Sequence, residues 1–119
     1  MADDTIVYKI LTRQAWEAAI AAGRFDGSAD DARDGFIHLS SRAQVADTAA
    51  KHFRGQADLV LVVLATADLS DGLTWEPSRG GALFPHLYGF LSPGSALSVT
   101  PLPLDADGVP MVAETLARC

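Results

Sequence analysis

The stretch Asp34-Gly-Phe-Ile-His-Leu-Ser-Ser41 lies between two polar segments and predicts a central β-strand. Side chains alternate along a strand, so Ile37 and Leu39 are expected to face the core. His38 and Ser40 then share the opposite face, close to the turn that opens the stretch. A histidine and a hydroxyl group two residues apart beside a tight turn make this strand the first candidate for a functional site.

Two elements are predicted before this strand. Alternating apolar residues indicate a strand over 5–11, in which Lys9 is a lone charge on a half-apolar face. Lys9 would either pack its stem at a sheet edge with its ammonium in water, or bind an anion. Thr12 and Gly23 are typical boundaries of a helix over 13–22, with Trp16, Ala19 and Ile20 on its buried face.

The segment 24–33 contains a glycine, a serine and three aspartates, which predicts an exposed loop with one helical turn near 30–33. One interpretation is a solvated connection. The other is that Gly27 and Ser28 bring the backbone close to a ligand beside the following strand.

After the central strand, Ser41 and Gln44 have the spacing of a capping box for a helix that runs to about Phe53. The apolar run 59–64 indicates a strand buried on both faces, in the middle of a sheet. The remaining predictions are a short strand 73–76 stopped by Pro77, a flap or hairpin loop over 78–82, an edge strand 95–102 and a short helix 110–117. This order predicts one α+β domain over residues 1–119.

Composition narrows the class of protein. The 119 residues carry a formal charge of −6, from fifteen acidic and nine basic residues. An acidic surface repels a phosphate backbone, which argues against general nucleic-acid binding. The first residues lack the basic and apolar regions of a secretory signal, and no apolar run is long enough to span a bilayer. Cys119 is the only cysteine, which excludes an intrachain disulfide and predicts a cytoplasmic protein.

Familiar catalytic motifs are absent from the sequence: it contains no glycine-rich phosphate loop, serine nucleophile elbow or paired-histidine zinc helix. The polar candidates near strand ends are His38, Ser40, Glu76, Arg79, His86 and Tyr88. His38 and Glu76 could act as an acid/base pair, or as a ligand-orienting histidine and an electrostatic carboxylate. A metal site from His38, His86 and Glu76 is chemically allowed, but no spacing requires it and we predict none.

Each candidate also has a structural interpretation. His38 could be a hydrogen-bonded core histidine, Glu76 a surface charge before a proline turn, and His86 a turn residue after Pro85.

Several blocks, in this order, resemble a family of bacterial and plant proteins called domain of unknown function 952. The blocks are Val7-Tyr-Lys-Ile10, Trp16-Glu17, Gly27-Ser28, Asp34 to Ser40, Leu73-Thr-Trp-Glu76, Gly80-Gly81 and Phe84-Pro-His-Leu-Tyr-Gly89. The resemblance implies an ADP-ribosyltransferase-like fold: a split, curved pair of small sheets with about six strands, two main helices in the N-terminal half and a short C-terminal helix. In that fold group the sheets surround a nicotinamide-dinucleotide cleft.

The resemblance also implies roles for single residues. The strand of His38 is similar to a histidine-containing strand of RNA 2′-phosphotransferases, although those enzymes use several arginines where this chain has Lys9. By this likeness His38 hydrogen-bonds a ribose hydroxyl, Ser40 assists it, and Glu76 stabilises positive charge on ribose as a nicotinamide bond breaks. The ligand-binding residues implied are Lys9, Ser28, Arg79, His86 and Tyr88, with Tyr88 or Trp75 stacking on a base and Arg79 meeting phosphate.

Two functions follow as expectations. The first is a nucleotide-binding protein, with NAD or a related small molecule as ligand and ADP-ribosyl transfer as its reaction. The alternative is a non-catalytic binding or interaction module that kept the fold without the chemistry. The sequence leaves the oligomeric state open.

Overall fold

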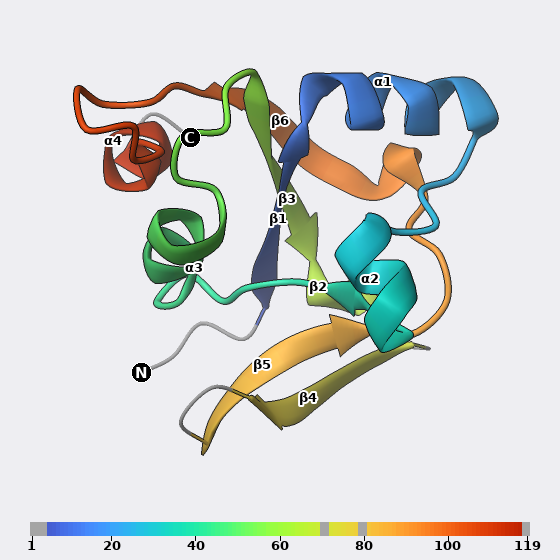
Figure 1. Ribbon diagram of the computed structural model, residues 1–119. Helices are drawn as coiled ribbons and strands as arrows, with labels where there is room; N and C mark the ends of the chain where they lie inside the picture. The colour runs from blue at the N-terminus through green and yellow to red at the C-terminus, as the bar shows by residue number, and fades with distance from the viewer. Residues whose placement is uncertain (1–4, 70–71, 79–80, 118–119) are drawn as a thin grey trace.

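The computed structural model describes residues 5–69, 72–78 and 81–117, and within them the chain folds into two three-stranded antiparallel sheets and four α-helices (Figure 1). The first sheet has the order β1 (Ile6–Thr12), β3 (Leu59–Ala65), β6 (Ala96–Leu102). The second has the order β2 (Ile37–His38), β5 (Ala82–Leu87), β4 (Leu73–Ser78). The predicted α+β class is confirmed.

Strand β3 lies in the middle of the first sheet, as its apolar run predicts. Helix α1 (Arg13–Ala22) covers one face of this sheet, where Val62 and Leu64 pack with the helix residue Trp16. Helices α3 (Val45–His52) and α4 (Val112–Ala117) cover the other face (Figure 1). Two short 3₁₀ turns, η1 (Thr66–Leu69) and η3 (Pro93–Ser95), complete the connections.

Helix α1 has the predicted boundaries. The Thr12 side chain accepts a hydrogen bond from the backbone N–H of Ala15, and Gly23 ends the helix in the left-handed conformation at φ 83°. Trp16 and Ala19 are buried as expected, whereas Ile20 is 56% exposed, so its predicted core position is wrong.

The segment before β2 contains the helical turn predicted near 30–33, and the helix, α2 (Ala29–Asp34), is one residue longer at each end. Ser28 and Asp31 form a capping box, and Asp31 is only 2% exposed. The expectation of an exposed segment is wrong for Asp31, because its side chain turns inward rather than into solvent. α2 also adds to the two main helices implied by the family resemblance.

The predicted central strand is much shorter than its apolar stretch. Only Ile37 and His38 form a strand, β2, at the edge of the second sheet, with His38 opposite His86. Ser40 then makes an isolated antiparallel bridge with Tyr8 of β1. The N–H of Leu39 donates to the carbonyl of Pro85 at 3.1 Å, but Pro85 has no N–H to return a bond, so the ladder stops there. The inward direction of Ile37 and Leu39 is confirmed, since both are buried.

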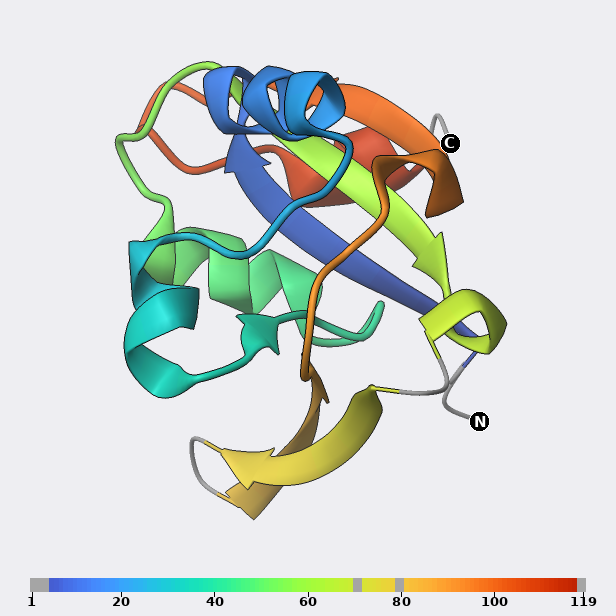
Figure 2. The same cartoon turned by 90° about the vertical axis from the view of Figure 1, so that its right-hand side faces the viewer.

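Two further boundaries differ. Strand β4 continues through Pro77 to Ser78, which an edge strand tolerates because the missing N–H faces away from a neighbour. Helix α3 begins at Val45, after a turn in which Gln44 accepts a hydrogen bond from the N–H of Ser41. The β4–β5 hairpin extends away from the first sheet (Figure 2), and Leu73 and Leu87 on its inner face pack into the core.

Candidate functional site

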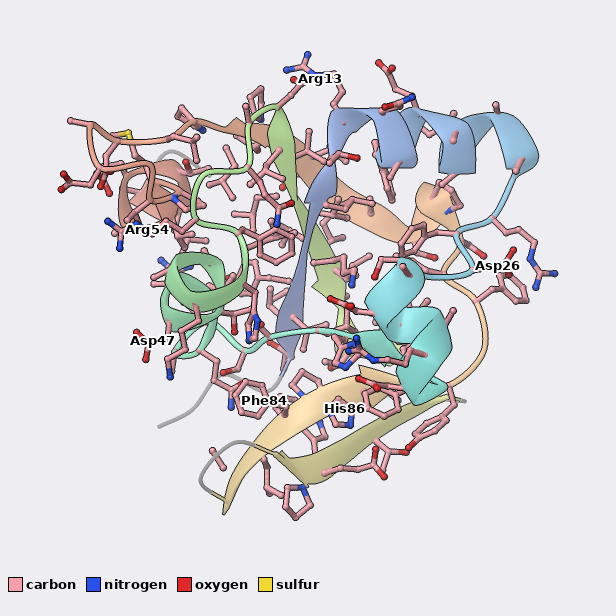
Figure 3. All side chains as sticks on the ribbon, viewed as in Figure 1. Arg13, Asp26, Asp47, Arg54, Phe84 and His86 are labelled. Carbon is pink, nitrogen blue, oxygen red and sulfur yellow. The ribbon has the colours of Figure 1, made fainter. Side chains whose placement is uncertain are left out.

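Two histidines from different parts of the chain meet on one face of the second sheet. His38 on β2 lies directly opposite His86 on β5, so both side chains project to the same side. Their ring centroids are 5.8 Å apart with an edge-on arrangement. Figure 3 shows His86 on β5 close to helix α2, the element that supplies the carboxylates around His38.

A buried ion pair between Lys9 and Asp31 fixes the position of His38. Lys9 Nζ lies 3.0 Å from Asp31 Oδ2 and also donates to the backbone carbonyl of His38 at 3.0 Å. Asp31 Oδ1 accepts from the backbone N–H of His38 at 3.0 Å and lies 2.7 Å from its ring Nδ1. The N–H, the C=O and the imidazole of this one residue are therefore all fixed by the Lys9–Asp31 pair.

Asp31 accepts one more hydrogen bond, from the backbone N–H of Ser28 at 2.8 Å. Burial by itself would raise the pKa of Asp31, but the Lys9 ammonium, the His38 ring and these backbone N–H groups outweigh it and hold the pKa below its ordinary value. Burial lowers the pKa of Lys9, and the adjacent Asp31 carboxylate opposes that shift. Lys9 is 6% exposed, so the prediction that its ammonium reaches water at a sheet edge is wrong.

We expect Asp31 to make stability depend on acid pH. Its folded pKa is depressed, so its contribution is present above 3.8, the ordinary pKa of an aspartate, and is lost as the pH falls from there through the lower folded pKa. Urea unfolding at several acid pH values should show the gap in unfolding free energy between the wild type and Asp31→Asn narrowing in that window. A gap of constant size from pH 7 into the acid range would contradict this assignment.

A second carboxylate contacts the other nitrogen of His38. Asp34, the last residue of α2, places Oδ2 2.9 Å from His38 Nε2. The imidazole therefore lies between one buried carboxylate and one that is 37% exposed. Both ring nitrogens can donate at once only when the imidazole carries two protons.

His86 has its own carboxylate. Its Nδ1 lies 2.8 Å from Glu76 Oε1, and the Tyr88 hydroxyl donates to the same oxygen at 2.7 Å. Glu76 and His86 share a face because Thr74, two residues before Glu76, is the register partner of His86. The hydrogen bonds from Tyr88 and then His86 lower the pKa of Glu76, so it is a carboxylate at neutral pH.

Phe36 fills the space between these groups. Its ring stacks on His86 with centroids 3.9 Å apart, and lies 4.7 Å from the ring of His38 and 5.5 Å from that of Tyr88. A groove of about 440 Å³ is lined in part by Tyr88, whereas Phe36, His38 and His86 are not in its lining. Its lining includes Leu69, Gly72, Tyr88, Phe90 and Ser95.

This geometry can be set beside known proteins. The family model for proteins of unknown function called DUF952 matches residues 10–105. The chain belongs to the DUF952 family. The crystal structure of protein CC0527 from Caulobacter crescentus is 55% identical to it, covers 95% of this chain and 99% of that one, and superposes with a TM-score of 0.92. The solution NMR structure of CC0527 gives 54% identity, coverage of 96% and 98%, and a TM-score of 0.85. No curated protein matches the chain.

The structure of this DUF952 chain brings four of the predicted site residues together: His38, Glu76, His86 and Tyr88 form one cluster, and Lys9 reaches it through Asp31. Ser28 caps α2 and so holds Asp31. Ser40 is buried, and its hydroxyl donates to Thr48 of α3 at 3.2 Å. Arg79 and Cys119 lie outside the described residues. The functional roles given to these residues stay predictions.

Three residues of this cluster were missed as site residues: Asp31, Asp34 and Phe36. Asp31 carried a usable signal, because Ser28-Ala-Asp-Asp31 has the spacing of a helix N-terminus with an acidic third residue. Phe36 also had a signal, because the alternation of a strand places it on the same face as His38. Asp34 had none, since its contact with His38 depends on how α2 meets β2.

Metal binding and membrane crossing are two other classes of function. Within the described ranges, no three His, Cys, Asp or Glu side chains are arranged to hold a metal ion. In the same ranges, no helix has the length and apolar character needed to cross a membrane.

Proposed function

We propose that the face formed by Phe36, His38, Glu76, His86 and Tyr88 binds a nucleotide-type ligand. The observation that supports this most is the pair of imidazoles on adjacent strands, each with Nδ1 on a carboxylate: Asp31 at 2.7 Å and Glu76 at 2.8 Å. A carboxylate on Nδ1 fixes the ring orientation, so Nε2 is the atom that can meet a ligand. At His38 the exposed Asp34 carboxylate lies at that nitrogen, 2.9 Å away. Two imidazoles prepared in this way suit the vicinal hydroxyl groups of a ribose.

The ligand class we propose is NAD or a related nucleotide, and the reaction is an ADP-ribosyl transfer in an ADP-ribosyltransferase-like fold. In this reaction His38 hydrogen-bonds a ribose hydroxyl through Nε2. Glu76, kept ionised by Tyr88 and His86, stabilises the positive charge that develops on the ribose as the bond to nicotinamide breaks. Ser40, bonded to Thr48 beneath the strand, would act by supporting the position of His38.

The aromatic residues support a place for the base. Tyr88 is 45% exposed and Phe90 is 48% exposed, and both line the groove of about 440 Å³. Exposed aromatic rings beside a groove bind planar heterocycles by stacking. Trp75 is partly buried and packs against the core, so Tyr88 is the better candidate for this contact.

A second function is favoured by one contact. Phe36 stacks on His86 with ring centroids 3.9 Å apart, which occupies the face of the imidazole. A ring held there limits access to His86, which favours a non-catalytic module that binds a ligand without transforming it. In that case the same face would bind ADP-ribose but release no nicotinamide from NAD.

Calorimetric titration with NAD and with ADP-ribose tests the proposal, followed by chromatography of an NAD incubation to detect nicotinamide. Binding of both ligands with release of nicotinamide supports the transfer reaction. Binding without release supports the non-catalytic module. No heat and no competition from either ligand at millimolar concentration would refute nucleotide binding at this face.

A further inference from the structure

The two ring nitrogens of His38 contact two carboxylates, one buried and one exposed to solvent. Asp31 contacts Nδ1 and its side chain is 2% exposed, enclosed with Lys9. Asp34 contacts Nε2 at 2.9 Å and its side chain is 37% exposed. Because Nδ1 faces a buried partner, Nε2 is the ring nitrogen through which His38 can bind a ligand, and Asp34 stands at that nitrogen.

Asp34 is able to turn away from His38 at small cost. Its other partner is Arg33, whose side chain is 68% exposed and also contacts Asp30 at 3.1 Å. The hydrogen bond from Arg33 lowers the pKa of Asp34, so its carboxylate is ionised at neutral pH. Moving this exposed side chain leaves no buried charge without a partner. Moving Asp31 would leave the buried ammonium of Lys9 without its carboxylate.

We propose that Asp34 determines which ligand group reaches His38: it admits a hydroxyl group and excludes a phosphate oxygen. When the imidazole of His38 carries two protons, a hydroxyl group can accept a hydrogen bond from Nε2 and donate one to the Asp34 carboxylate. A phosphate has only acceptors to offer and is repelled by the same carboxylate. This inference rests on the proposed function, because it concerns the ligand of the same face.

The other charges around His38 also disfavour a phosphate at this position. The other carboxylates at this face are Asp31 and Glu76, and the buried ammonium of Lys9 is already engaged with Asp31 and the backbone of His38. Arg33 is the exposed cation beside Asp34, and it is shared with Asp30. The site therefore favours the sugar part of a nucleotide next to His38 and places its phosphates farther away.

The test compares ADP-ribose with ADP-ribose 1″-phosphate, which carries an extra phosphate on the terminal ribose. Calorimetry would be done on the wild type, Asp34→Ala and Asp30→Ala. Asp30 is the matched control because it is on the same helix and also pairs with Arg33, whereas the ion pairs of His38 are with Asp31 and Asp34. We expect the wild type and Asp30→Ala to prefer ADP-ribose by about fivefold or more, and Asp34→Ala to bind the two ligands within about twofold of each other.

The outcomes separate the two claims. If the wild type binds ADP-ribose but Asp34→Ala still prefers it to ADP-ribose 1″-phosphate, this inference is overturned and the proposed function stands. The same conclusion follows if Asp30→Ala loses this preference as much as Asp34→Ala does. If the wild type binds neither ligand, the proposed function fails and the inference falls with it. Circular dichroism checks the fold of each variant, and Asp34→Asn, of nearly the same size, is expected to give the same loss of preference.

A measurement without ligand tests the contact itself. Diethyl pyrocarbonate acylates an accessible, unprotonated imidazole nitrogen, and mass spectrometry of peptides reads each histidine separately. His38 is expected to react severalfold faster in Asp34→Ala than in the wild type or Asp30→Ala, with His52 of α3 as the internal reference. Equal His38 rates in all three proteins would overturn the inference.

Discussion

Replacing Asp31 with alanine is expected to lower the free energy of unfolding by about 3–5 kcal/mol. The substitution leaves the ammonium of Lys9, which is 6% exposed, without its carboxylate. It also removes the acceptor of the backbone N–H groups of Ser28 and His38. Because small domains are stable by about 5–15 kcal/mol, this loss is a large fraction of the total. Urea unfolding followed by tryptophan fluorescence measures it.

Two further variants show whether the buried charge is the cause. Asp30→Ala removes an exposed carboxylate from the same helix and should cost less than about 0.5 kcal/mol. Lys9→Met with Asp31→Leu removes both charges together and should recover the part of the loss that is due to the unpaired ammonium. The part due to the N–H groups of Ser28 and His38, which still lack an acceptor, should remain. A cost below about 1 kcal/mol for Asp31→Ala would show that Lys9 has another adequate partner, contrary to the geometry described above.

Replacing His38 with alanine is expected to weaken ADP-ribose binding by about tenfold or more, while the unfolding free energy falls by less than about 1.5 kcal/mol. The ring supplies the ligand-facing Nε2, so its loss removes a direct contact. The fold should survive because Asp31 keeps Lys9 and the backbone N–H groups as donors. Titration calorimetry and urea unfolding of the same preparation give both quantities.

His52→Ala is the control for this prediction. It removes a histidine from helix α3, on the opposite side of the first sheet from α1, and should leave the affinity unchanged. Equal affinities of the wild type and His38→Ala would remove His38 from the binding site. A large loss of stability in His38→Ala would instead assign the residue a structural role.

The elements that were predicted correctly have signals within their own sequence. Helix α1 carries its cap and its left-handed glycine at the right spacing, and strand β3 is apolar on both faces because both faces are covered. The elements that were missed depend on partners elsewhere. The length of β2 is limited by the proline at position 85, and the direction of Asp31 depends on Lys9, 22 residues earlier.

The same distinction applies to the site. His38 stood out because a histidine on an otherwise apolar strand is unusual, and Glu76 and His86 could be selected as polar residues near strand ends. Their meeting required the register of β2 with β5 and of β5 with β4, which no local periodicity specifies. The contacts of Asp31 and Asp34 with His38 could not be predicted for the same reason, since the contact of α2 with β2 is tertiary.

A titration of the isotopically labelled protein with ADP-ribose, followed by backbone amide NMR, shows whether the two histidines form a nucleotide-binding face. We expect saturable shifts concentrated at residues 36–40 and 84–88, greatly reduced in His38→Ala and retained in His52→Ala. An absence of shifts, or shifts confined to α3 and α4, would contradict nucleotide binding at this face.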